Sequence, residues 1–259
     1  MQDVQVIFES KDIIAVAKHA PLATVPARST PDSVLGRLQA EVAGEVFAVH
    51  RIDQRVSGVI LFARSRPAAA RLSKLFAGPD VVREYWAICE SAPREETGRL
   101  EHLLVRDGRR RKARVVRAGG RACVLDYTVV GFTKSFALLT VSTQMGRFHQ
   151  VRAQLAAAGA IVRGDLKYGA RRSTKSGMIG LHARALHFPA GTSAEPAAET
   201  AGGRSPEVGL PTKLVAPVLP RRQNHHDVDA DLWAMFPDLQ DSRDSPEESG
   251  PPDRSGTPV

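Results

Sequence analysis

The 259-residue chain can form one large domain or two small ones, and its 42% apolar residues suffice for a sizeable core. Its net charge of +8 is uneven: residues 1–220 carry 32 basic and 19 acidic side chains (+13), while residues 221–259 carry 4 and 9 (−5). A basic body favours a polyanionic partner, because neutralised phosphates release counterions, although a basic protein with merely solvated Arg side chains is the alternative.

The sequence excludes several classes of protein. No apolar run approaches the length that spans a bilayer, and the N-terminus lacks a basic segment followed by a long apolar one. Cys89 and Cys123 lie far apart inside apolar runs, so both are interpreted as small buried side chains without a disulfide. We therefore expect a cytoplasmic protein without a membrane segment.

The first third of the chain predicts short strands and two helices. Asp32 or Ser33 is expected to cap a helix that Gly44 ends. Ser65 is expected to cap a second helix, which stops at Gly78. Short apolar runs predict strands over residues 4–8, 13–17, 46–49, 59–63 and 81–90.

The following residues continue as strands with one further helix. Residues 146–158 predict a helix, with Gly159 as its stop. Strands are expected over residues 100–105, 114–117, 123–130, 136–142, 178–188 and 210–219. The short connections favour an α+β fold, in which a mixed, mainly antiparallel central β-sheet is flanked by helices.

The composition changes near the C-terminus. We expect one domain over residues 1–220, in which residues 190–209, rich in Ala, Gly, Ser, Thr and Pro, form a loop insertion. Residues 221–259 form an acidic tail rich in Pro and Ser, which we expect to be disordered from about residue 237.

The stretch from His50 to Ala63 joins a charged cluster, a turn of small residues and an apolar run. Asp53 is its single carboxylate, and the flanking Arg51 and Arg55 should keep it ionised by charge attraction. Such an Asp is either a structural ion-pair partner or a nucleophile, and the residues alone favour the ion pair.

Other familiar catalytic patterns are missing from the sequence. It contains no Gly-x-Gly-x-x-Gly, no Walker loop, no His-Glu-x-x-His and no Gly-x-Ser-x-Gly. The histidines show no metal-ligand spacing with Cys or acidic partners. We therefore expect neither a metal nor a cofactor.

Five ordered motifs resemble the RluA family of pseudouridine synthases. The stretch at 50–63 resembles His-Arg-Leu-Asp-x-x-Thr-Ser-Gly-Leu-Leu-Leu-Phe-Ala, with Ile52 and Val56 as departures. The motifs that follow are Arg83-Glu84-Tyr85-Trp86-Ala87, Gly146-Arg147-Phe148-His149-Gln150-Val151-Arg152, Gly164-Asp165-Leu166-Lys167-Tyr168-Gly169 and Leu181-His182-Ala183-Arg184-Ala185-Leu186. The resemblance covers about residues 4–220. Many relatives carry an S4 RNA-binding domain ahead of the catalytic one, and none is expected here.

The resemblance implies the pseudouridine synthase catalytic fold and a site that isomerises uridine within folded RNA. Asp53 is then the essential carboxylate, acting on either the base or the sugar. Arg152 is expected to pair with Asp53, with an Arg on the helix surface as the alternative. Tyr85 is expected to stack on the target base and is a candidate for helping to remove the C5 proton, with core packing as the alternative. Arg51 is expected to fill the space left by the flipped base, or else to contact a phosphate.

The resemblance also implies that the partner is structured RNA, either ribosomal or transfer RNA. We expect a monomer without an obligate protein partner. The candidate RNA-contacting residues are Arg51, Arg55, Arg109, Arg110, Arg111, Lys112, Arg147 and His149. The alternative for the four successive cations at 109–112 is a solvated turn. A catalytically silent RNA-binding protein on the same scaffold is the alternative function, supported by Val56 and Phe148, where the family has Thr.

Overall fold

A mixed β-sheet forms the centre of the protein in the computed structural model, which describes residues 4–189 and 210–217. The expected insertion at 190–209 and the acidic tail at 221–259 lie outside the described residues. The strands are β1 (Val4–Glu9), β2 (Ile13–Lys18), β3 (Phe47–Ala48), β4 (Ser57–Ala63), β5 (Val82–Cys89), β6 (Thr97–Asp107), β7 (Lys112–Val116), β8 (Arg121–Phe132), β9 (Ala137–Thr143), β10 (Leu181–His187) and β11 (Lys213–Val215).

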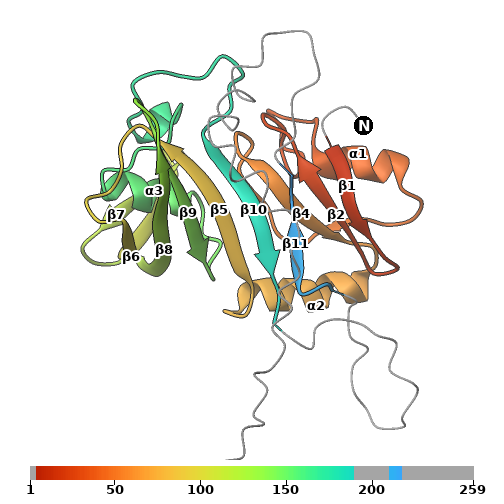
Figure 1. Ribbon diagram of the computed structural model, residues 1–259. Helices are drawn as coiled ribbons and strands as arrows, with labels where there is room; N and C mark the ends of the chain where they lie inside the picture. The colour runs from red at the N-terminus through yellow and green to blue at the C-terminus, as the bar shows by residue number, and fades with distance from the viewer. Residues whose placement is uncertain (1–3, 190–209, 218–259) are drawn as a thin grey trace, which may run out of the picture.

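The described strands follow the order β1-β2-β4-β10-β5-β9-β8-β6-β7, with β3 beside β4 and β11 beside β10. Strands β4 and β10 pair in parallel, and the other pairs are antiparallel. Figure 1 shows β5 and β10 in the middle, joining a left-hand group of strands to a right-hand group. The expected α+β class with a mainly antiparallel sheet is confirmed.

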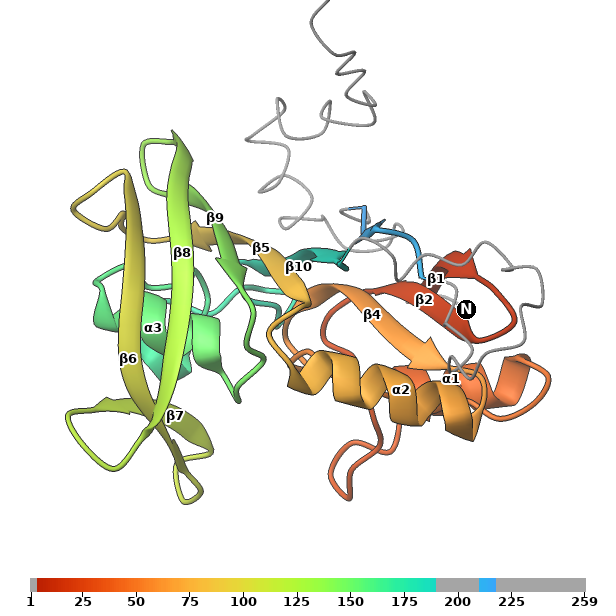
Figure 2. The same ribbon diagram turned by 90° about the horizontal axis from the view of Figure 1, so that it is seen from below.

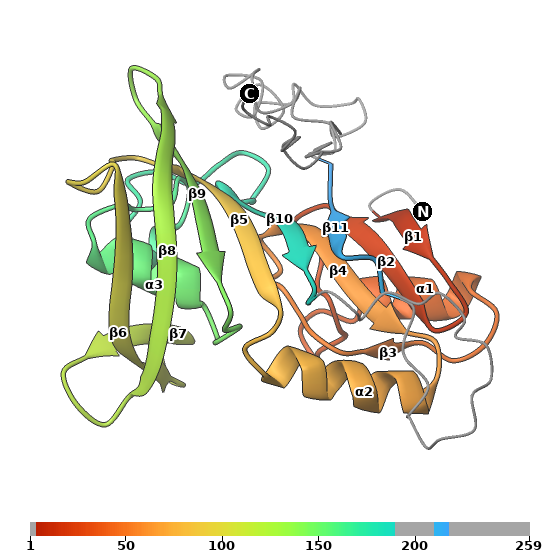
Figure 3. The same cartoon turned by 60° about the horizontal axis from the view of Figure 1, so that its bottom comes forward.

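Three α-helices and one 3-10 turn accompany the sheet in the described residues. They are α1 (Val34–Glu41), α2 (Arg66–Ala77), α3 (Gln150–Ala157) and η1 (Leu166–Tyr168). Seen from below, α3 lies with β6, β8 and β9, while α1 and α2 lie with the other group of strands (Figure 2). Figure 3 shows α2 running beneath β3 and β4. None of the described helices is long and apolar enough to cross a membrane.

The two larger apolar cores of the described residues lie on opposite faces of the sheet. On one face Ile60 and Phe62 of β4 belong to the core that includes residues of α1 and α3. On the other face Val59 and Leu61 of the same strand belong to the core that includes residues of α2. All four side chains are fully buried. The apolar run that follows Asp53 is therefore a central strand covered on both faces, which anchors one end of the Asp53 loop.

The N-caps of α1 and α2 agree with the sequence, whereas the end expected at Gly44 and one predicted helix start do not: α1 ends at Glu41, with Val42 as its C-cap. Ser33 and Ser65 accept hydrogen bonds from the backbone of the first turns of α1 and α2. The helix expected from residue 146 begins at Gln150, because His149 has a left-handed backbone with φ of 53°. Residues 146–149 therefore lie ahead of α3 and not in its first turn, and His149 among them has its side chain beside Asp53.

A glycine lets β4 approach β10 directly after the Asp53 loop. Gly58 has φ of +124°, and a Cβ there would collide with the backbone of Ala183. The neighbouring Ser57 Oγ lies 2.8 Å from Nδ1 of the buried His182. Both contacts fix the end of the loop against β10, which explains the Ser-Gly pair in the first motif.

Candidate active site

The loop that carries Asp53 is held through its backbone. The carbonyl groups of five successive residues, 52–56, each accept a hydrogen bond. The donors are Thr24 Oγ1 to Ile52 at 3.0 Å, Val56 N to Asp53 at 3.0 Å, Leu22 N to Gln54 at 3.1 Å, Ile179 N to Arg55 at 3.0 Å and Lys18 Nζ to Val56. A loop with its carbonyls satisfied has little freedom, so the Asp53 side chain leaves from a fixed backbone.

Lys18 lies beneath this loop with 1% of its surface exposed. Its ammonium group donates to the carbonyl oxygens of His19, Gln54 and Val56. Burial lowers the pKa of Lys18 to about 7, while the charge of Asp53 opposes that shift. Val56 itself is 2% exposed and packs in the core, so the departure from Thr places a methyl group, not a hydroxyl, in an apolar environment.

Asp53 is one of two carboxylates bound by the same guanidinium. Arg152 Nη1 donates to Asp53 Oδ2 at 2.7 Å. Arg152 Nε and Nη2 donate to Asp165 Oδ2 and Oδ1 at 2.6 and 2.7 Å. The Arg152 and Asp165 side chains are 5% and 0% exposed, whereas that of Asp53 is 21% exposed. The buried two-bonded pair fixes the guanidinium plane, which presents its remaining nitrogen to the more accessible carboxylate.

Two adjoining hollows open beside Asp53. The smaller, of about 60 Å³, is lined by Asp53 itself, together with Arg152 and His149. The larger, of about 510 Å³, lies in the size range of small-ligand sites. Both hollows are lined by Arg51, Ile52, Tyr85, Met145, Gly146 and Arg147. They therefore form one connected site.

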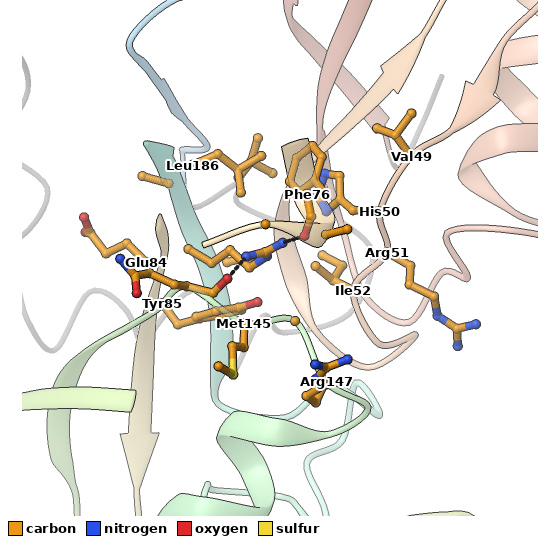
Figure 4. Close-up of a pocket in the computed structure, with 18 of the residues that line it drawn as sticks. Val49, His50, Arg51, Ile52, Phe76, Glu84, Tyr85, Met145, Arg147 and Leu186 are labelled. Carbon is orange, nitrogen blue, oxygen red and sulfur yellow. Dashed lines mark hydrogen bonds between the residues drawn. The ribbon is translucent and has the colours of Figure 1, made fainter. Parts of the chain in front are cut away.

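Figure 4 shows the larger hollow, with Arg51 extended away from it and Arg147 below Met145. The guanidinium of Arg83 is bound by backbone carbonyls at its base: Phe76 at 2.8 Å and Gln144 at 2.6 Å. Because these carbonyls belong to α2 and to the segment after β9, Arg83 ties both walls of the hollow to β5.

Tyr85 stands on β5 between β9 and β10, paired in register with Val141 and Ala183. Its ring lines both hollows. Burial raises the pKa of Tyr85 to about 12, with the Arg83 charge opposing and the Asp53 charge adding to the shift. Near neutral pH the phenol therefore keeps its proton. A protonated ring can stack on a base, but it cannot remove a proton as a phenolate would.

The predicted RNA-contacting residues occupy three different positions. Arg51 and Arg147 are exposed at the edge of both hollows, and His149 lies beside Asp53 in the smaller one. The exposed Arg109, Arg110 and Arg111 and the half-buried Lys112 form the turn between β6 and β7 and the first residue of β7.

Arg55 differs from the other predicted RNA contacts. Its guanidinium donates to the carbonyl groups of Gly164, Gly177 and Met178, which ties the Asp53 loop to the chain after α3. Neither Arg51 nor Arg55 pairs with Asp53 by an ion contact of the kind that Arg152 makes. The expected partner Arg152 is the arginine that pairs with Asp53, and the expectation that Arg51 and Arg55 help to keep the carboxylate ionised stays a prediction.

Sequence reasoning missed several residues of this site. Asp165 and Tyr168 lie in the fourth motif, but nothing in that motif alone indicated that they face Arg152. Tyr168 places its ring 5.0 Å from the Arg152 guanidinium carbon. Within the described residues no group of three or more His, Cys, Asp or Glu side chains is placed to hold a metal ion.

Three histidines buried around the site predict a pH-dependent stability. Burial lowers the pKa values of His50, His149 and His182 to about 3, 4 and 4. Unfolded histidine binds a proton below about pH 6.5, whereas these folded ones stay neutral, so the free energy of unfolding should fall as pH drops from 6.5 toward 4. Each His contributes at most about 1.4 kcal/mol per pH unit. Urea denaturation at pH 7.5, 6 and 5 measures the slope, and equal midpoints would contradict it.

The comparisons with known proteins point in one direction. A family model described as RNA pseudouridylate synthase matches residues 12–157, more than half of the chain. The chain is 31% identical over 175 residues, 64% of its length, to YhcT of Bacillus subtilis, an RNA pseudouridine synthase described as uncharacterized. It is 29% identical over 71% of its length to ribosomal large subunit pseudouridine synthase D of Zymomonas mobilis. These matches span 58% and 64% of the two relatives, roughly three fifths of their length.

Two solved human structures share the fold. RNA pseudouridylate synthase domain containing 1 superposes with a TM-score of 0.65 and 21% identity, covering 90% of this chain and 95% of its own. RNA pseudouridylate synthase domain containing 4 superposes with a TM-score of 0.60 and 24% identity, covering 71% of this chain and 84% of its own. At these identities the likeness establishes the fold.

Proposed function

Because the chain belongs to the RNA pseudouridylate synthase family, we propose that it isomerises specific uridines to pseudouridine within structured RNA. The observation that carries the proposal is the Asp53 carboxylate, clamped by Arg152 at 2.7 Å and accessible from a hollow with exposed arginines at its edge. Such a carboxylate is fixed and charged, yet open to a substrate, as a nucleophile must be.

The proposed reaction needs no external group. The N1–C1′ bond of the uridine breaks, the uracil turns, and a C5–C1′ bond forms. C5 then loses its proton and N1 carries one, so the product is an isomer of the substrate. In this proposal Asp53 reacts with the base or the sugar while the uracil turns, and Arg152 holds it in place.

The target uridine must leave the RNA stack to reach Asp53, at a cost of a few kcal/mol. We assign Tyr85 to stacking on the flipped base, since its ring lines both hollows and stays protonated near neutral pH. Arg51, exposed and extended from the loop two residues before Asp53, is assigned to the space that the base leaves. We further propose ribosomal or transfer RNA as the substrate, and a monomer acting in the cytoplasm.

The proposal is tested on RNA from a strain that lacks the gene. Purified protein is added to the total RNA, and pseudouridine is mapped transcriptome-wide with and without it. We expect one or a few uridines to be converted. If none is converted while RNA still binds, the catalytically silent RNA-binding protein becomes the better account.

RNA affinity should depend strongly on salt, because the turn at 109–112 and the arginines near the hollows would neutralise phosphates. Reversing Arg109 and Arg110 to Glu should weaken binding and reduce the slope of log affinity against log salt by roughly 2. Arg66→Glu is a control, since Arg66 lies on α2, away from that turn. Titrations from 50 to 300 mM salt measure the slopes, and an equal change in both variants would contradict an RNA contact at the turn.

A further inference from the structure

His149 occupies a position beside Asp53 that the proposed function has not yet used. It is the last residue before α3, and its side chain is 7% exposed. Its Nε2 lies 3.5 Å from Asp53 Oδ2, the same oxygen that Arg152 binds. That separation is longer than an N–H···O hydrogen bond, and catalytic contacts are commonly long before substrate closes the site.

The partner on the other side of the ring indicates which nitrogen carries the proton. His149 Nδ1 lies 3.1 Å from the Tyr168 hydroxyl. That hydroxyl accepts the backbone N–H of Ala113 at 2.8 Å, and its one proton lies within reach of two acceptors, His149 Nδ1 and the Ala113 carbonyl oxygen at 3.2 Å. Because the Asp53 carboxylate on the other side of the ring can only accept, we assign the hydroxyl proton to Nδ1. With Nδ1 as the acceptor, a neutral imidazole carries its N–H at Nε2, directed at Asp53.

Phe148 shields the face of the imidazole. The two rings stack with centroids 4.0 Å apart and planes 20° from parallel. The guanidinium of the exposed Arg106 lies over the Phe148 ring, and its central carbon is 4.8 Å from the ring centroid. Arg106, Phe148 and His149 therefore form three layers that run from the surface at β6 to the catalytic carboxylate.

The charges around His149 partly cancel. Burial is the main cause that lowers its pKa to about 4; Asp53 and Asp165 oppose the shift, while Arg152 and Lys167 add to it. The facing Tyr168 has its own pKa raised to about 12, mainly by burial, and remains a neutral donor. His149 is therefore uncharged near neutral pH, so Arg152 remains the cation that contacts Asp53.

We propose that His149 is a positioning residue for Asp53, held by Tyr168 and by the Phe148 ring so that its Nε2–H points at Oδ2. Within the described residues the close contacts of Asp53 from Arg152 and His149 both reach Oδ2, which leaves Oδ1 as the oxygen that reacts. This inference rests on the proposed function, because it concerns the oxygen that meets the flipped uridine.

The three layers of Arg106, Phe148 and His149 also keep His149 uncharged. A protonated His149 would place a second cation on Oδ2 and stabilise the carboxylate anion, which makes Asp53 a weaker nucleophile. Phe148, at a position where the related family has Thr, keeps water from the imidazole and so keeps it neutral at mildly acidic pH.

The test separates position from charge with four variants. His149→Ala should lower kcat on the order of 10-fold to 100-fold with KM little changed, because Asp53 loses one of two contacts that orient it. His149→Gln can place an amide N–H near the position of Nε2 and should recover much of that loss. Tyr168→Phe should lower kcat less than His149→Ala. Each kcat is measured by single-turnover pseudouridine formation.

Phe148→Thr supplies a readout that a merely structural role would not move. The pKa of His149, followed by NMR in the whole protein, should rise from near 4 toward 6.5, and kcat should gain an acidic limb near pH 6 that the wild type lacks. Equal kcat in wild type and His149→Ala, or an unchanged pH profile in Phe148→Thr, would overturn the role proposed for His149 and leave the proposed function standing. A wild type that forms no pseudouridine would overturn the proposed function, and this inference with it.

Discussion

Asp53→Asn is expected to abolish pseudouridine formation while the fold and the affinity for RNA stay close to those of the wild type. The amide has nearly the shape of the carboxylate but is neutral and a far weaker nucleophile, so kcat should fall by on the order of 10³-fold or more. The fold should persist because Arg152 keeps both bonds to Asp165, and because the loop is held through its backbone carbonyls.

Pseudouridine formation on the mapped RNA measures the effect, and unfolding by urea and RNA binding are followed beside it. Asp126→Asn makes the same chemical change at an exposed carboxylate on β8 that pairs with Arg99, and should leave kcat unchanged. Residual activity of the Asp53 variant above about 1% of the wild type would show that another group carries the chemistry.

Much of the sheet was predictable because its strands are short apolar runs between polar or glycine-rich turns. The run after Asp53 is apolar at every position because β4 contributes side chains to an apolar core on each face of the sheet, and the second of these cores includes residues of α2. Ser33 and Ser65 were predicted as caps for a local reason as well, since a serine oxygen accepts the free N–H groups of the first helical turn.

What the sequence could not predict depends on contacts between distant segments. The helix α3 begins at Gln150 and not at the predicted residue 146, because His149 adopts a left-handed backbone. No periodicity in apolar residues reveals such a backbone conformation. Arg51 and Arg55 flank Asp53 in sequence, yet it is Arg152, 99 residues further along, that binds it; the resemblance of the motifs predicted this pair, whereas the charge spacing around Asp53 did not. Neighbours along an irregular loop point in different directions, so charge spacing in a sequence cannot assign ion pairs there.

His50 illustrates the same point at the first residue of the catalytic motif. Its ring stacks on Phe76 at 4.3 Å, and its Nε2 accepts the backbone N–H of Leu61 at 2.8 Å. The side chain thus joins α2 to β4 and lies in the wall of the larger hollow. A histidine three residues before the proposed catalytic carboxylate can therefore serve the packing of the site rather than its chemistry.

Asp165→Asn is expected to damage both stability and catalysis, although Asp165 touches no substrate. The variant leaves the buried Arg152 without its two-bonded anion, and breaking one side of a buried pair costs about 3–5 kcal/mol. The freed guanidinium would then turn both of its remaining nitrogens onto Asp53 and cover Oδ1 as well as Oδ2. We expect kcat to fall on the order of 100-fold, since small displacements of a reacting group have effects of that size.

Urea denaturation and single-turnover kinetics separate the two effects. Where Asp165→Asn does not fold, Arg152→Lys tests the same geometry, because an ammonium keeps the charge but cannot hold two carboxylates in one plane. It should retain most of the stability while losing most of kcat. Wild-type kcat in Arg152→Lys would mean that charge alone suffices at Asp53. The guanidinium plane that the fully buried Asp165 fixes would then contribute to the stability of the fold and not to the reaction.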